Sequence, residues 1–219
     1  MLTKNIPAQI RLAALVLLYV AFTGMVLTIW QYASFSTTAG FLAFKQEVIS
    51  NAFWRIAFYI HVFTCFLCLA AGFTQFLPAR QFRMQWHRWL GRIYAANIIL
   101  INFPVALVMG IYANGHLPGK IAFILLDLLW VYFTIGGIYW IRKGSVTLHR
   151  DFMTRSYALT LTALTLRLCK FVMSRYTNWS YDDIYIFDAW AALIINLAVA
   201  EIIVRRRYYL SNRRLETIR

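Results

Sequence analysis

Charged residues, and acidic residues above all, are what this sequence has least of. Only 8 Asp and Glu occur among 219 residues, and charged residues make up 14% of the chain. Soluble domains carry about 25% charged and about 45–50% apolar residues, whereas 61% of this chain is apolar. A soluble domain of this length cannot bury so large an apolar share, and intrinsic disorder is excluded. The composition therefore indicates that lipid is the main solvent.

Cysteine is also scarce. The three cysteines, Cys65, Cys68 and Cys169, all lie in apolar stretches. An odd, small number in such surroundings argues against a disulfide framework. Cys65 and Cys68 form a C-x-x-C within CFLCLAA, and we interpret them as small apolar packing residues.

Six segments are apolar over about 20 residues, the length that a membrane-spanning helix needs. They cover residues 8–30, 53–78, 87–113, 119–141, 152–175 and 183–204. The first is too long, and too poor in a small-residue cleavage site, to be a removable signal peptide. We therefore predict an all-α integral membrane protein with a single domain over residues 1–219. It is a bundle of six transmembrane helices with the second to fifth spans as its core.

The basic residues are distributed unevenly around these spans. The chain has 22 Lys and Arg, and sixteen of them fall on the side that would hold both termini. This bias predicts a multi-pass protein of the inner cell membrane with cytoplasmic N- and C-termini. It also explains the net charge of +14 without a nucleic-acid partner. We expect residues 205–219 to form a basic cytoplasmic tail on anionic lipid, and Glu201 to pair with Arg205 along the last helix.

Two short segments of the sequence resemble each other. Residues 87–95 read HRWLGRIYA and residues 149–158 read HRDFMTRSYA, each at the cytoplasmic start of a span. The match indicates a parallel repeat of two helical hairpins, an architecture that places sites at the repeat interface. Shared basic start signals explain it equally well. Free backbone N–H groups at helix starts favour anions. The candidate inner site consists of His87, Arg88, Arg92, His149, Arg150 and Arg155.

Haem b is a candidate cofactor for this inner site. Bis-histidine haem needs two imidazoles at one depth on different helices, and His87 with His149 meets that condition. The arginines would neutralise the propionates, and haem iron would be the only metal. On the external side of the membrane, the only candidate partner for His61 is His116, which lies in a predicted loop. The sequence therefore gives only weak support to a second pair of haem-ligating histidines. The pattern is similar in outline to membrane cytochromes of the b561 kind.

Three ionisable residues lie deep in the expected spans. His61, Asp127 and Arg167 each fall eight residues from the external end of their span, which is about 12 Å at a rise of 1.5 Å per residue. Ionisable groups at such depth are functional candidates, and Asp127 is expected to pair with Arg167. The layer is either a proton, anion or cofactor site or a structural clamp.

The stretch from His61 to Lys170 resembles an uncharacterised bacterial family of membrane proteins, domain of unknown function 2306. The features that carry the resemblance are His61, HRWLGRIY, FILLDLLW and HRDFMTRSYALTLTALTLRL, over about half of the chain. The resemblance implies a multi-span bundle without an established activity. The residues that match the family's features are His61, His87, Arg88, Gly91, His149, Arg150, Met153, Arg155 and Arg167. His116 is not among them, which counts against a pair with His61.

Three hypotheses about function follow. The first is an electron-transfer protein that binds haem b or a quinone through His87 and His149, with a quinone or a redox protein as partner. The second is a proton-coupled transporter or small-molecule-binding protein that uses His61, Asp127 and Arg167. The third is a non-catalytic membrane scaffold or assembly subunit. Nucleophile–base, phosphate-loop and zinc-ligand motifs do not occur, so the sequence leaves open whether the protein is an enzyme.

Overall fold

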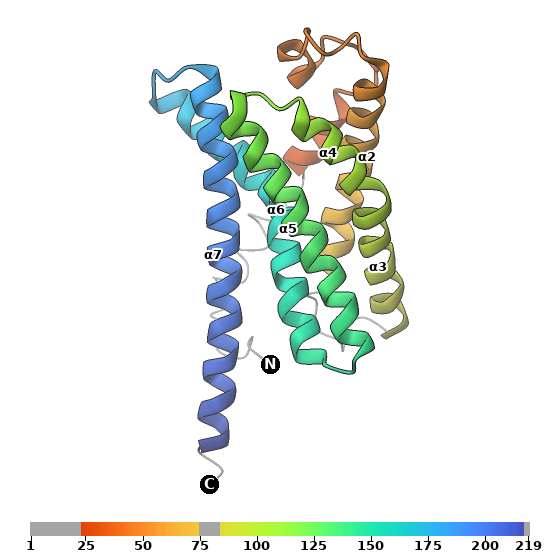
Figure 1. The fold of residues 1–219 in the computed structure, drawn as a ribbon, viewed down its shortest axis with the longest axis vertical. Helices are drawn as coiled ribbons and strands as arrows, with labels where there is room; N and C mark the ends of the chain where they lie inside the picture. Colours follow the sequence, from red (N-terminus) through yellow and green to blue (C-terminus); the bar gives the residue numbers. More distant parts are fainter. Residues whose placement is uncertain (1–22, 75–83, 217–219) are drawn as a thin grey trace. The chain divides into compact units, whose positions relative to one another are not determined.

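The structure is a computed structural model that describes residues 23–74 and 84–216 (Figure 1). It has two compact units, Met1–Asn51 and Ala52–Arg219. Every regular element in the described ranges is helical, so the all-α prediction is confirmed for them. The first predicted span, residues 8–30, lies mostly outside the described residues, of which 23–30 are helical.

The described part of the first unit is a short helix followed by turns. After residues 23–30 the chain makes tight turns and then the 3-10 helix η1 (Gly40–Phe44). The Phe41 backbone N–H donates to the Tyr32 hydroxyl at 3.0 Å, and Leu42 is buried. Gly40 has a φ of 50°, a left-handed conformation that glycine adopts without strain.

The second unit consists of long helices that correspond to the other five predicted spans. They are α2 (Ala52–Thr74), α3 (Met84–Ala96), η2 (Asn97–Asn102), α4 (Phe103–Ile111), α5 (His116–Arg142), α6 (Val146–Tyr176) and α7 (Tyr181–Glu216). Four stretches within the described ranges are long and apolar enough to cross a membrane: Ala52–Gly72, Met84–Ile111, His116–Arg142 and Tyr181–Arg213. Helix α6 is long enough to cross a membrane, but it is not among these four stretches.

One predicted span contains a wide turn. Residues 97–102 form a π-helix that joins α3 to α4, and the Phe103 N–H bonds to the Ile98 carbonyl five residues back. Pro104 follows in the first turn of α4. Proline lacks the N–H of a regular helical turn, which favours irregular bonding at this point. Wide turns of this kind are frequent at functional sites.

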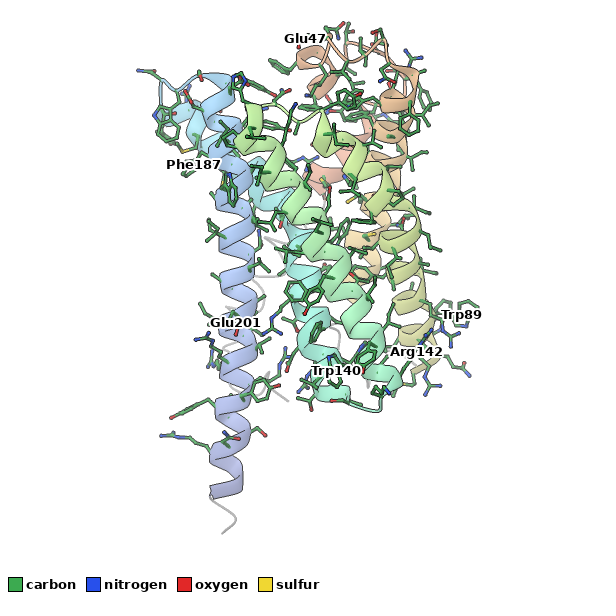
Figure 2. All side chains as sticks on the ribbon, in the orientation of Figure 1. Glu47, Trp89, Trp140, Arg142, Phe187 and Glu201 are labelled. Atoms are coloured by element: carbon green, nitrogen blue, oxygen red, sulfur yellow. The ribbon has the colours of Figure 1, made fainter. Side chains whose placement is uncertain are left out.

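In the second unit α3, η2 and α4 form one continuous rod, and this rod and the helices α2, α5, α6 and α7 alternate in direction along the chain (Figure 1). Consequently α3 and α6 run the same way, as expected for parallel hairpin repeats. They begin at what we call the basic end, which carries Arg88, Arg92, Arg142 and Arg150; Figure 2 shows Trp89, Trp140 and Arg142 there. Helix α6 packs against α2, α5 and α7. The core contains Cys68, Ala71, Tyr94, Ile98, Trp130, Tyr157, Leu159 and Leu193.

Local sequence signals explain where the helices α6 and α7 begin. The Ser145 hydroxyl accepts a hydrogen bond from the Leu148 N–H at the start of α6. At the start of α7 the Ser180 hydroxyl accepts from the Asp183 N–H at 3.2 Å and donates to the Asp183 carboxylate at 2.7 Å. Both arrangements satisfy backbone donors that a helix start leaves free.

The last helix is longer than the predicted span. We expected a span over 183–204 followed by a tail over 205–219, but α7 continues without interruption to Glu216. The predicted pair is present, with Arg205 Nε at 3.1 Å from the Glu201 carboxylate. Arg207 is bound to Asp151 of α6 at 2.7 Å. These ion pairs stabilise the helix beyond the apolar run.

Candidate functional site

The two histidines of the predicted inner site lie near each other. His87 is in the first turn of α3 and His149 is in the first turn of α6. Both side chains are half-buried, and the two imidazoles interact electrostatically. Because α3 and α6 run in the same direction, the two rings lie at the same end of the bundle.

His149 is held in one orientation by a backbone carbonyl. Its Nδ1 lies 2.8 Å from the Gly137 oxygen of α5. A carbonyl can only accept, so Nδ1 carries the hydrogen and the neutral ring keeps its lone pair on Nε2. Histidines that bind metals are held in this way. Gly137 is itself closely packed against α6, since a Cβ at this position would meet the Met153 sulfur.

Two of the predicted arginines are free to bind an anion at this end. The side chains of Arg88 and Arg150 are exposed and form no hydrogen bond or ion pair with a described residue. Arg88 also interacts electrostatically with His87. Arg92 instead lies over the Trp89 ring, 5.6 Å from its centre, which is a cation–π distance.

The structure places Arg155 in a different arrangement, between α6 and α7. Its guanidinium donates to the Glu201 carboxylate at 2.6 Å. Asp151 accepts from Arg207 at 2.7 Å, and Arg207 also donates to the Thr154 hydroxyl at 3.2 Å. We call these five residues the α6–α7 clamp. Because Arg155 is engaged there, it is not free to bind an anion beside His149.

The residues of the predicted intramembrane layer do not form the expected ion pair. Asp127 is 4% exposed and forms no hydrogen bond or ion pair with a described residue. The Arg167 side chain is exposed and donates to the Ala163 carbonyl of its own helix at 2.8 Å. Arg167 interacts electrostatically with His61, and Cys65 interacts with both Arg167 and Asp127. The layer therefore joins α2, α5 and α6.

His116 does not approach His61. It is the first residue of α5, its side chain is 84% exposed, and its Nε2 lies 3.7 Å from the Asp182 carboxylate at the start of α7. His61 is nine residues inside α2, and its Nδ1 is buried without a partner. The structure thus gives no support to a second histidine pair.

The sequence analysis missed a buried network of hydroxyl groups in the middle of the bundle. The Tyr94 hydroxyl lies 2.9 Å from Ser156 Oγ and 2.8 Å from Thr160 Oγ1. Trp130 Nε1 donates to Thr160 Oγ1 at 3.1 Å, and Thr134 Oγ1 lies 2.8 Å from Ser156 Oγ. The network joins α3, α5 and α6 seven residues after His87 and His149, which fixes the two helices that carry the histidines.

A Tyr94→Phe substitution is expected to lower the free energy of unfolding by about 1–3 kcal/mol, because it removes two buried hydrogen bonds, to Ser156 and Thr160, each worth about 0.5–1.5 kcal/mol. Tyr139→Phe is the matched control, since Tyr139 is 52% exposed and should be nearly neutral. Denaturant unfolding in detergent, followed by circular dichroism, measures both. Equal effects of the two substitutions would show that the network contributes nothing.

A second cluster of buried polar side chains joins the π-helix to α2. Asn97 Nδ2 donates to the Thr64 carbonyl at 2.7 Å. Asn102 is fully buried, and its Nδ2 donates to Asn97 Oδ1 at 2.9 Å and to Thr64 Oγ1 at 3.2 Å. The Asn102 Oδ1 has no partner. This group fastens the π-helix to α2 at the depth of the intramembrane layer.

The donor sets available in the described ranges limit the kind of metal that could bind. No group of three or more His, Cys, Asp or Glu side chains there could hold a metal ion. An ion that takes all of its ligands from the protein needs such a group, whereas a haem iron needs only two axial ligands. His87 and His149 can supply those two.

Comparison with known families gives a match over residues 58–204 to the family described as "Predicted membrane protein (DUF2306)". The match covers well over half of the chain and runs from α2 into α7, so it includes both histidines and the intramembrane layer. No curated protein and no solved structure matches the chain. These comparisons show no similarity to b561-type cytochromes.

Proposed function

The chain belongs to the DUF2306 family of membrane proteins, and on that premise we propose that it transfers electrons in the membrane through a redox group held between His87 and His149. The observation that carries the proposal is the pair itself. The two imidazoles interact at the starts of parallel helices, and a Gly137 carbonyl fixes the tautomer of His149.

Haem b fits the residues at the basic end. His149 would present Nε2, and His87 has no hydrogen bond to a described residue that would compete with a ligand role. The exposed Arg88 and Arg150 would neutralise the propionates. Haem supplies one-electron chemistry when it is bound. The chain's own part is to hold the two imidazoles and, through the Gly137 carbonyl, to make His149 a more basic ligand.

The membrane arrangement that accompanies this function is also a proposal. Residues 8–30 and helix α6 would add two spans to the four apolar ones, giving six spans, a single domain and cytoplasmic termini in the inner cell membrane. The basic end, and with it the histidine pair, would face the cytoplasm because basic loops are retained there. Residues 205–219 would reach anionic lipid headgroups.

The test is an absorption spectrum of the detergent-purified protein after expression with sufficient haem, oxidised and reduced. We expect a Soret band that is lost in His87→Gln and in His149→Gln and is retained in His116→Gln, because His116 lies apart from the pair. Circular dichroism checks that the variants fold.

Two other outcomes are informative. If the band is absent but a quinone copurifies and is lost in His149→Gln, electron transfer stands with a quinone as the redox group. If neither haem nor quinone is present, the proposal fails. The pair is then part of a scaffold.

A further inference from the structure

The intramembrane layer contains buried groups that have no hydrogen-bond partner among the described residues and no part in the proposed electron transfer. Asp127 lies eleven residues inside α5, about 16 Å along the helix axis at its usual rise. It is 4% exposed and forms no hydrogen bond or ion pair with a described residue. His61 Nδ1, on α2, is likewise buried without a partner. The layer thus has unmet bonding capacity on two helices.

A carboxyl group in such surroundings must be neutralised by something that binds to it, because an ionised carboxylate without a partner is costly in a membrane interior. A metal cation is disfavoured. Arg167 brings positive charge to the same layer through its interactions with His61 and Cys65. In the described ranges no group of three or more His, Cys, Asp or Glu side chains is arranged to hold a metal ion. A proton needs no further ligand.

We propose that Asp127 is a proton-binding site within the membrane. Across the helix interface, Cys65 of α2 interacts electrostatically with Asp127 and lies one helical turn from His61. The site is separate from the histidine pair at the basic end and does not depend on a redox group.

Other charged and titratable groups lie on the helices that pack around α5. They are His61 and Cys65 on α2, Arg167 and Lys170 on α6, and Asp188 on α7. Asp188 is 1% exposed and neither of its carboxylate oxygens has a partner, but Lys170 interacts with it electrostatically. Asp127 has no lysine beside it, so it is the stronger candidate.

Asp151 provides a matched control within the same chain. It is as buried as Asp127, at 2% exposure, but it accepts an ion-paired hydrogen bond from Arg207 at 2.7 Å. The two residues therefore differ in partnership and not in burial.

A hydrophobic carbodiimide tests the proposal on the full-length protein in phospholipid vesicles. The reagent, dicyclohexylcarbodiimide, reacts with a protonated carboxyl: the oxygen adds to the carbodiimide carbon, the proton goes to nitrogen, and rearrangement gives a stable N-acylurea with no leaving group. We expect mass spectrometry to find the adduct on Asp127 and none on Asp151. Labelling of Asp127 should fall as the pH is raised.

Variants complete the test. Asp127→Glu should keep the adduct at position 127, and Asp127→Asn should lose it while keeping the helical circular dichroism and any absorption spectrum of the basic end. Absence of the adduct from Asp127, or equal labelling of Asp127 and Asp151, would overturn the proposal. Neither of these two labelling results tests the proposal that His87 and His149 hold a redox group.

Discussion

Asp151→Ala is expected to lower the free energy of unfolding by about 3–5 kcal/mol, the usual cost of leaving a buried charge without its partner. The side chains of Asp151 and Arg207 are only 2% and 15% exposed, and they are joined at 2.7 Å across α6 and α7. After the substitution the Arg207 guanidinium would lie beside an apolar methyl group. Denaturant titration in detergent, followed by circular dichroism, measures the loss.

Two comparisons show whether the loss comes from the buried charge. The double variant Asp151→Leu, Arg207→Met should recover most of the stability, because it removes both charges and fills the space with apolar groups. Arg205→Ala should cost less than about 1 kcal/mol, since the Arg205 side chain is 80% exposed in its pair with Glu201. A double variant no more stable than Asp151→Ala would contradict the argument.

The clamp also shows what hydropathy can and cannot predict about this fold. Apolar runs locate helices such as α5, predicted over 119–141 and found over His116–Arg142, because the lipid core sets the length of a span. The same criterion ends the last span at residue 204, where the arginines begin. The helix continues because Arg205 and Arg207 form ion pairs, and one partner, Asp151, is distant in the sequence.

The candidate site was predictable where a motif marked it. The repeated His-Arg at the starts of two spans predicts that His87 and His149 form one site. Both residues lie in the first turns of α3 and α6, which run in the same direction (Figure 1), and the two imidazoles interact electrostatically. The acceptor for His149 could not be predicted. Gly137 acts through its backbone carbonyl, and a backbone acceptor leaves no trace in the residue types.

The intramembrane layer shows a limit of a different kind. Helical rise predicts the depth of Asp127 and Arg167, and that is why both were expected at one level. It does not predict where a long side chain goes, and Arg167 turns back to the Ala163 carbonyl. The hydroxyl network around Tyr94 was missed because a hydroxyl group in an apolar helix often bonds to the backbone of its own helix. Thr64 does so, with its hydroxyl 2.6 Å from the Ile60 carbonyl, so the residue type alone does not predict a bond to another helix.

Gly72→Leu is expected to lower the free energy of unfolding by about 2–4 kcal/mol, from overpacking and a lost hydrogen bond together. A Cβ at Gly72 would occupy the space of the Tyr157 ring of α6. That ring is 8% exposed, its hydroxyl donates to the Leu69 carbonyl at 3.2 Å, and it lies edge-on to Tyr94. The ring therefore cannot move aside without breaking the contact between α2 and α6.

The clash with the Tyr157 ring can be separated from the general effect of replacing a glycine within a helix. Gly72→Ala should already destabilise, whereas Gly24→Ala should be neutral or slightly stabilising, because a Cβ at Gly24 meets no atom within 4 Å and alanine is the better helix former. Tyr157→Ala should relieve part of the cost of Gly72→Leu by vacating the space, so the two effects should be less than additive. Fully additive losses would mean that the Tyr157 ring is not what excludes a side chain at position 72.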